Sequence, residues 1–90
     1  MKKYTKDNFT DDVKKARLMA GKFHLQYLGC DCNCFRVSFE DSDLGFRMDL
    51  YLSKMTLCIH SSNKANPIKY FKNQTWWQVE SVMKTYYNYI

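Results

Sequence analysis

The sequence predicts an α+β domain in two layers, an antiparallel meander of four or five strands with an N-terminal and a C-terminal helix on one face. Apolar residues recur at helical spacing near both ends of the chain, and apolar and polar residues alternate through its middle. A chain of 90 residues is long enough for only one core, so residues 1–90 are expected to form a single compact domain. Because alternating strands have one polar face, both helices should cover the other.

The first helix is expected over Thr10–Ala20. Phe9, Val13 and Ala16 fall on one side at helical spacing, and Gly21 supplies a common C-terminal stop. Three aspartates precede or begin this segment and four basic residues follow them, which matches the direction of the helix dipole.

Four or five strands are expected, over residues 23–27, 35–40, 46–52 and 55–60 and a short last segment at 68–71. The inward positions of the first four are Phe23, Leu25, Tyr27, Phe35, Val37, Phe39, Phe46, Met48, Leu50, Leu52, Met55, Leu57 and Ile59. Polar residues at 41–45 mark one turn, and Ser53 and Lys54 form a tight hairpin without the usual glycine. A polar loop over residues 61–67 leads to the last strand.

The second helix should begin at Thr75, because Thr75 and Gln78 have the spacing of a capping box. Its apolar stripe consists of Trp76, Val79, Val82, Met83, Tyr86 and Ile90.

Trp77 falls on the polar side of this helix, together with Lys84. A large aromatic side chain on a polar face indicates a contact surface for a partner, with Lys69 and Lys72 at its rim. The alternative is that a neighbouring loop or the N-terminal arm covers Trp77.

The outer face of the predicted sheet is a second candidate surface. Strand parity places His24, Arg36, Arg47, Tyr51, His60, Lys69 and Phe71 there. Basic and aromatic groups on an open sheet are typical of single-stranded nucleic-acid binding, for which Arg36, Arg47, Tyr51 and Phe71 are the candidate residues. The alternative is that Glu40 and Asp49 neutralise the two arginines across the strands.

The cysteines have three interpretations. Cys30, Cys32 and Cys34 form C-x-C-x-C, and a zinc site that combines Cys34 and Cys58 with His24 and His60 on the outer face is one of them. The spacing does not match standard zinc motifs. The second interpretation is a disulfide, but cysteines two apart on a strand bridge poorly. The third interpretation, reduced thiols in a turn with no metal or other cofactor, is therefore the one expected.

No catalytic residues are assigned. Cys58 and His60 share a strand face, but the sequence offers no orienting carboxylate at a recognisable offset and no oxyanion turn. We therefore expect a protein that is not an enzyme.

The net charge of +5 excludes a DNA mimic, which presents carboxylates at phosphate spacing. Neither a membrane span nor a secretion signal is evident, so a cytoplasmic location without membrane contact is expected.

In size and composition the chain resembles the small accessory proteins of phages and mobile elements, a class that includes anti-CRISPR inhibitors. This resemblance implies a non-catalytic protein that docks on a host nucleic-acid-handling protein or ribonucleoprotein complex and inhibits or modulates it. A direct single-stranded nucleic-acid binder and a small zinc-binding module are the alternatives.

Overall fold

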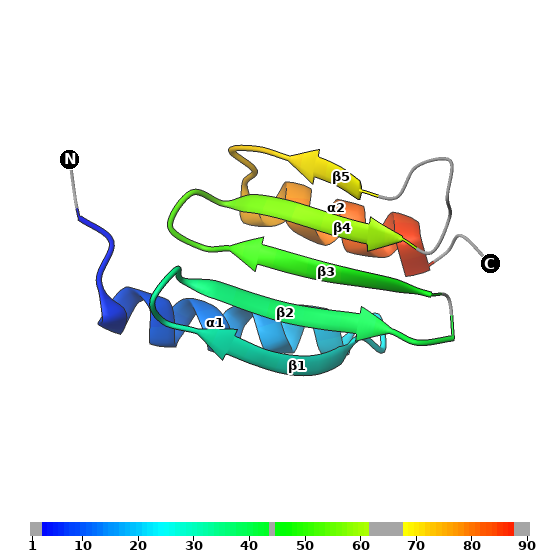
Figure 1. The fold of residues 1–90 in the computed structure, drawn as a ribbon, viewed down its shortest axis with the longest axis horizontal. Coiled ribbons are helices and arrows are strands. Elements are labelled where there is room, and N and C mark those ends of the chain that lie inside the picture. Colours follow the sequence, from blue (N-terminus) through cyan, green and yellow to red (C-terminus); the bar gives the residue numbers. More distant parts are fainter. Residues whose placement is uncertain (1–2, 44, 62–67, 88–90) are drawn as a thin grey trace.

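The computed structural model describes residues 3–43, 45–61 and 68–87, and it confirms the predicted α+β architecture. A five-stranded antiparallel meander in the order β1-β2-β3-β4-β5 forms one layer. Its strands are Gln26–Asp31, Arg36–Asp41, Phe46–Tyr51, Thr56–Ser61 and Ile68–Phe71. Helices α1 (Lys6–Gly21) and α2 (Trp76–Tyr87) form the other layer, with α1 behind β1 and β2 and α2 behind β4 and β5 (Figure 1).

Helix α1 begins four residues earlier than the sequence predicted. Thr5 is its N-cap: the Thr5 hydroxyl accepts from the Asn8 backbone N–H, and the Asn8 side chain accepts from the Thr5 backbone N–H. This reciprocal pair satisfies two N–H groups of the first turn. Asparagine in place of the usual glutamate or glutamine makes the signal hard to recognise. The helix does end at Gly21, as expected.

The first strand begins later than predicted. Residues 22–24 form a turn in which His24 has a φ of 58°, so Phe23 and His24 do not belong to the strand. Strand β1 then continues through Cys30, which was expected in a turn, and it contains a bulge between Tyr27 and Gly29. The alternating apolar pattern of residues 23–27 arises because residues 23–25 cross from α1 to the sheet beside the core and continue directly into β1.

Two hairpins have four-residue loops that end in a residue with a positive φ, a feature that the sequence did not predict. Residues 32–35 connect β1 to β2, and residues 52–55 connect β3 to β4, so the second loop has four residues and not the two expected at Ser53 and Lys54. The last residue of each loop has a positive φ, 53° for Phe35 and 48° for Met55. Both side chains pack against the core, which fixes a backbone conformation that is uncommon without glycine.

The core lies between the sheet and the helices. The buried apolar residues are Phe9, Ala16, Met19, Ala20, Leu25, Val37, Phe39, Phe46, Met48, Leu50, Leu52, Leu57, Ile59, Val79 and Met83. The predicted capping box of α2 is confirmed, with Thr75 Oγ1 accepting from the Gln78 N–H at 3.1 Å. Trp76 is only half-buried at the edge of the core, where the Lys15 ammonium lies 4.7 Å from its ring centroid.

Two expectations fall on residues outside the described ranges, namely Ile90 in the apolar stripe of α2 and the central part of the loop before β5. Neither helix in the described part of the chain is long and apolar enough to cross a bilayer.

Candidate functional site

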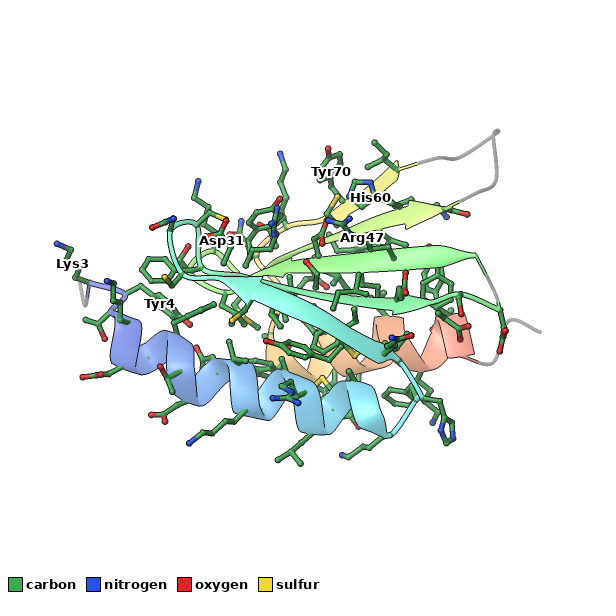
Figure 2. All side chains as sticks on the ribbon, turned by 60° about the horizontal axis from the view of Figure 1, so that its bottom comes forward. Lys3, Tyr4, Asp31, Arg47, His60 and Tyr70 are labelled. Carbon is green, nitrogen blue, oxygen red and sulfur yellow. The ribbon has the colours of Figure 1, made fainter. Side chains whose placement is uncertain are left out.

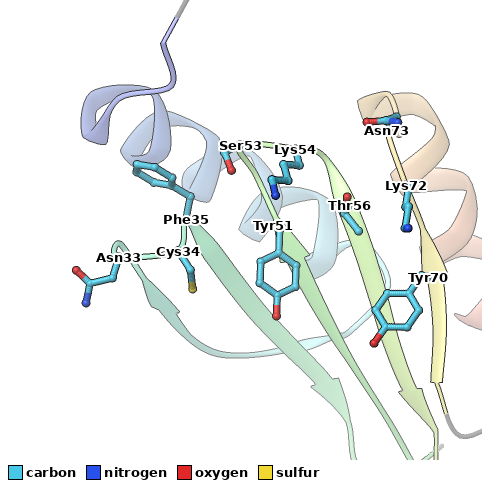
Figure 3. A pocket seen from close by; sticks show the side chains of 10 residues that line it. All are labelled: Asn33, Cys34, Phe35, Tyr51, Ser53, Lys54, Thr56, Tyr70, Lys72 and Asn73. Atoms are coloured by element: carbon cyan, nitrogen blue, oxygen red, sulfur yellow. The ribbon is translucent and has the colours of Figure 1, made fainter.

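An open groove of about 1030 Å³ lies at the end of the outer sheet face where three loops meet. The β1–β2 loop, the β3–β4 loop and the segment after β5 all reach this end of the sheet (Figure 1). The lining residues are Asn33, Cys34, Phe35, Tyr51, Ser53, Lys54, Thr56, Tyr70, Lys72 and Asn73 (Figure 3). We refer to it as the loop-end groove.

Tyr51 and Tyr70 provide the aromatic surface of the loop-end groove. They come from β3 and β5, on either side of β4, and both rings lean away from the loops toward the middle of the sheet (Figure 3). Tyr51 lies directly opposite Arg36 in the β2–β3 ladder, and Tyr70 lies directly opposite Cys58 in the β4–β5 ladder. Tyr70 is 62% exposed, so most of its surface is open to solvent.

Positive charge accompanies these rings. Lys54 and Lys72 are exposed and line the loop-end groove, while none of the ten described lining residues is acidic. Lys3 lies at the same end of the molecule as the β1–β2 loop (Figure 2). The other end of this face has a different character, because a shallow hollow there is lined by Glu40 and Asp41 together with Arg47 and His60. An anion on the outer face would therefore be attracted more strongly to the loop end than to the β2–β3 turn.

Asp49 lies beneath the middle of the outer face with only 3% of its side chain exposed. Its carboxylate accepts from the Ser38 hydroxyl at 2.6 Å and from Arg47 Nε at 3.1 Å, and it lies 3.1 Å from His60 Nε2. Burial acts to raise the pKa of Asp49, but the bonds from Ser38 and Arg47 outweigh it, so the pKa lies below its ordinary value. The carboxylate stays charged and holds three strands together.

These contacts also determine what Cys58 and His60 can do. The Cys58 sulfur lies 3.4 Å from His60 Nε2, the same nitrogen that faces Asp49. A nucleophile relay needs the thiol on one ring nitrogen and the carboxylate on the other. In addition, Cys58 is 3% exposed, and burial together with the Asp49 charge raises the pKa of its thiol. This arrangement is a structural network and not an activated thiol.

The structure places some of the predicted outer-face residues on that face and others elsewhere. Arg36, Arg47, Tyr51 and His60 lie on it, and the outward residues of β5 are Ile68 and Tyr70, which pair with His60 and Cys58. Phe71 pairs with the inward Leu57 and packs against the core, so its assignment to the outer face was wrong.

Two other assignments to the outer face were also wrong. Lys69 pairs with the inward Ile59 and therefore has the opposite parity, although its side chain is exposed. His24 lies in the turn after α1 and not in a strand. Neutralisation of Arg47 by Asp49 does occur, but the two residues lie two apart on the same strand and not across strands.

The predicted helix surface is present but lies on the other layer. Trp77 is 78% exposed, so no described residue covers it, and Lys84 is exposed in the last turn of the same helix. Lys69 is exposed on β5. Lys72, which was predicted at the rim of the Trp77 surface, instead lines the loop-end groove together with Tyr70.

The cysteines occupy two environments. Cys30, Cys32 and Cys34 are exposed, and Cys58 is buried, all four as free thiols. Because His24 is not on the sheet, the proposed Cys/His combination loses its geometric basis. Within residues 3–43, 45–61 and 68–87, no three histidine, cysteine or acidic side chains are placed to hold one metal ion.

Sequence reasoning missed Tyr70 and the buried position of Asp49. The register of β5 decides which aromatic residue faces outward, and a shift of one residue would replace Tyr70 by Phe71. Comparisons with protein families, with curated proteins and with solved structures gave no match.

Proposed function

We propose that the protein is a non-catalytic binding protein that holds single-stranded nucleic acid on the outer face of its sheet. The observation that carries this proposal is the composition of the loop-end groove, where Tyr51 and Tyr70 stand beside Lys54 and Lys72 without an acidic neighbour among the lining residues. Aromatic rings stack on bases and lysines contact phosphates, and this combination is how sequence-tolerant single-strand binders work.

The placement of the rings supports the same function. Tyr51 and Tyr70 come from strands on either side of β4 and project from the same face of the sheet. Side chains carried by the strands of a sheet need little backbone rearrangement when a ligand arrives. An open groove on a sheet also suits an extended strand better than a duplex, whose bases are not accessible for stacking.

The test is equilibrium binding of a fluorescein-labelled oligothymidylate of about ten nucleotides, followed by anisotropy over a series of salt concentrations. Binding to the single strand should exceed binding to the matching duplex, and the affinity should fall linearly on a logarithmic salt scale because bound counterions are released. Equal binding to duplex and single strand would contradict the proposal.

A second candidate function rests on Trp77. An indole that is 78% exposed on a helix is a typical anchor for a protein partner, and Lys84 on the same face favours an acidic one. In this version the protein docks through α2 on a host nucleic-acid-handling complex and inhibits or modulates it. Trp77→Ala should then weaken capture of that complex by about 2 kcal/mol without a change in melting temperature.

The two candidate functions give opposite results for one pair of variants. Nucleic-acid binding should be lost with Tyr70→Ala and kept with Trp77→Ala, because the two side chains lie on opposite layers of the fold. Docking through α2 should show the reverse pattern and a weaker dependence on salt.

A further inference from the structure

A second, smaller hollow of about 240 Å³ lies on the outer face, over β1, β2 and β3. Its lining residues are Leu28, Gly29, Cys30, Arg36, Ser38 and Arg47. The bulge in β1 creates it, because Leu28 is an extra residue opposite β2 and Gly29 pairs with Ser38. Gly29 has a φ of 147° and no atom lies within 4 Å of the place where a Cβ would be, so the space above it is open. We call this space the bulge hollow.

Two guanidinium groups border the bulge hollow, and both retain hydrogen-bonding capacity. Arg47 uses Nε and Nη2 on Asp49, which leaves part of its five N–H donors for an outside acceptor. Arg36 is a long 4.0 Å from Asp31, and its Nε has no partner among the described residues. A guanidinium with few strong bonds loses little when it turns toward an anion.

The bulge hollow and the loop-end groove are adjacent on the outer face. Arg36 lines the hollow, and Tyr51 lines the groove. Arg36 and Tyr51 are also direct partners in the β2–β3 ladder. A base stacked on Tyr51 would therefore have its sugar-phosphate close to the Arg36 guanidinium.

We infer that the bulge hollow is a phosphate subsite, in which Arg36 and Arg47 bind one phosphate group of the strand whose base stacks on Tyr51. This inference rests on the proposed function, since it needs a strand on the outer face. Two arginines and a glycine that leaves space for close approach are suited to a compact, doubly bonded oxyanion. The phosphate is either an internal phosphodiester or the terminal phosphate of the strand, and the experiment separates these sources.

The experiment measures the dissociation constants of short oligothymidylates that carry one uncharged methylphosphonate linkage at successive positions, and of the same oligomer with and without a 5′-phosphate. Each is titrated into the wild-type protein, Arg36→Gln and the control Lys14→Gln, whose lysine is exposed on α1 in the opposite layer. Arg36→Gln should weaken binding of the unmodified strand about tenfold and reduce the slope of log affinity against log salt by about 0.7, whereas the control should leave both unchanged.

The decisive result is a coupling between one phosphate and Arg36. At one position the neutral linkage should weaken binding to the wild type but have no further effect in Arg36→Gln, as expected for two groups that contact each other. A 5′-phosphate that strengthens binding only when Arg36 is present would identify the terminal source. Tyr51→Phe, which keeps the stacking ring and changes no charge, should leave the salt slope unchanged.

Three outcomes are distinguishable. Coupling at an internal or a terminal phosphate supports the subsite. Strand binding by the wild type without coupling to Arg36 at any position overturns the subsite and leaves the proposed function in place. Absence of strand binding by the wild type overturns both.

Discussion

Arg36 and Tyr51 are direct partners across β2 and β3 in the sheet ladder. The Tyr51 hydroxyl is the main cause that raises the pKa of Arg36 above its ordinary value, so the guanidinium stays charged. The ladder thereby places a cation beside a stacking surface before any ligand binds.

Tyr70→Ala should weaken binding of single-stranded oligonucleotide by about 1–3 kcal/mol, because it removes a ring on which a base stacks. Tyr70→Phe keeps the ring and should bind nearly as well as the wild type. Anisotropy titrations of both variants at one salt concentration make the comparison. Equal losses for alanine and phenylalanine would show that the hydroxyl, and not stacking, is important.

Lys54→Gln and Lys72→Gln should each reduce the salt dependence of binding, with a decrease of about 0.7 in the logarithmic slope for every phosphate that the variant no longer binds. Both lysines are exposed, so the melting temperature should not change. Lys84→Gln on α2 is the matched control. If the control reduces the slope as much as the two groove variants, the strand does not follow the loop-end groove.

Asp49→Asn should lower the free energy of unfolding by about 2 kcal/mol at pH 7, because the buried carboxylate accepts bonds from Ser38 and Arg47. Since the pKa of Asp49 is lowered in the folded state, its contribution is complete above the ordinary carboxyl range and is lost as the pH falls through the folded pKa. The difference between wild type and variant in urea unfolding should therefore shrink below about pH 4. A constant difference down to about pH 2 would contradict this account of Asp49.

Thiol titration with an aromatic disulfide reagent should count three reactive cysteines in the native protein. Cys30, Cys32 and Cys34 are exposed, whereas Cys58 is buried beneath the outer face and its thiol pKa is raised. The fourth thiol should react only after denaturant is added. Rapid reaction of all four would mean that the covering by Tyr70 and His60 opens readily.

Trp76→Ala should cost about 2 kcal/mol of stability, since the ring is half-buried against the core and contacts the Lys15 ammonium. Trp77→Ala should cost less than about 0.5 kcal/mol, because that side chain is exposed. Thermal melts of the two variants compare adjacent tryptophans in one helix. A larger loss of stability for Trp77→Ala than for Trp76→Ala would show that the buried side of α2 has been assigned to the wrong residues.

Much of the fold follows from periodicity. The alternation in β2, β3 and β4 identifies the inward residues correctly, and the Thr75–Gln78 pair locates the start of α2. The start of α1 was missed because its cap uses Asn8, and the start of β1 was missed because an apolar connection beside the core has the same pattern as a strand.

The candidate site was less accessible to sequence reasoning, because it depends on which residues become neighbours across strands. The register of β5 decides that Tyr70 and not Phe71 lies outward, and a loop sequence does not determine that register. Likewise, Gly29 is a local signal of a bulge, since glycine within a strand often marks one, but it does not specify that the bulge lies opposite Ser38. Asp49 was expected on a solvated face, yet its neighbours on three strands bury it.

The most direct test of the central claim is an NMR titration that follows backbone amide and tyrosine ring signals as a single-stranded oligothymidylate is added. The account predicts shifts at Tyr51, Tyr70, Lys54 and Lys72, with the Trp77 indole signal unchanged. Shifts confined to Trp77 and its neighbours on α2, or no shifts at millimolar oligonucleotide, would contradict it.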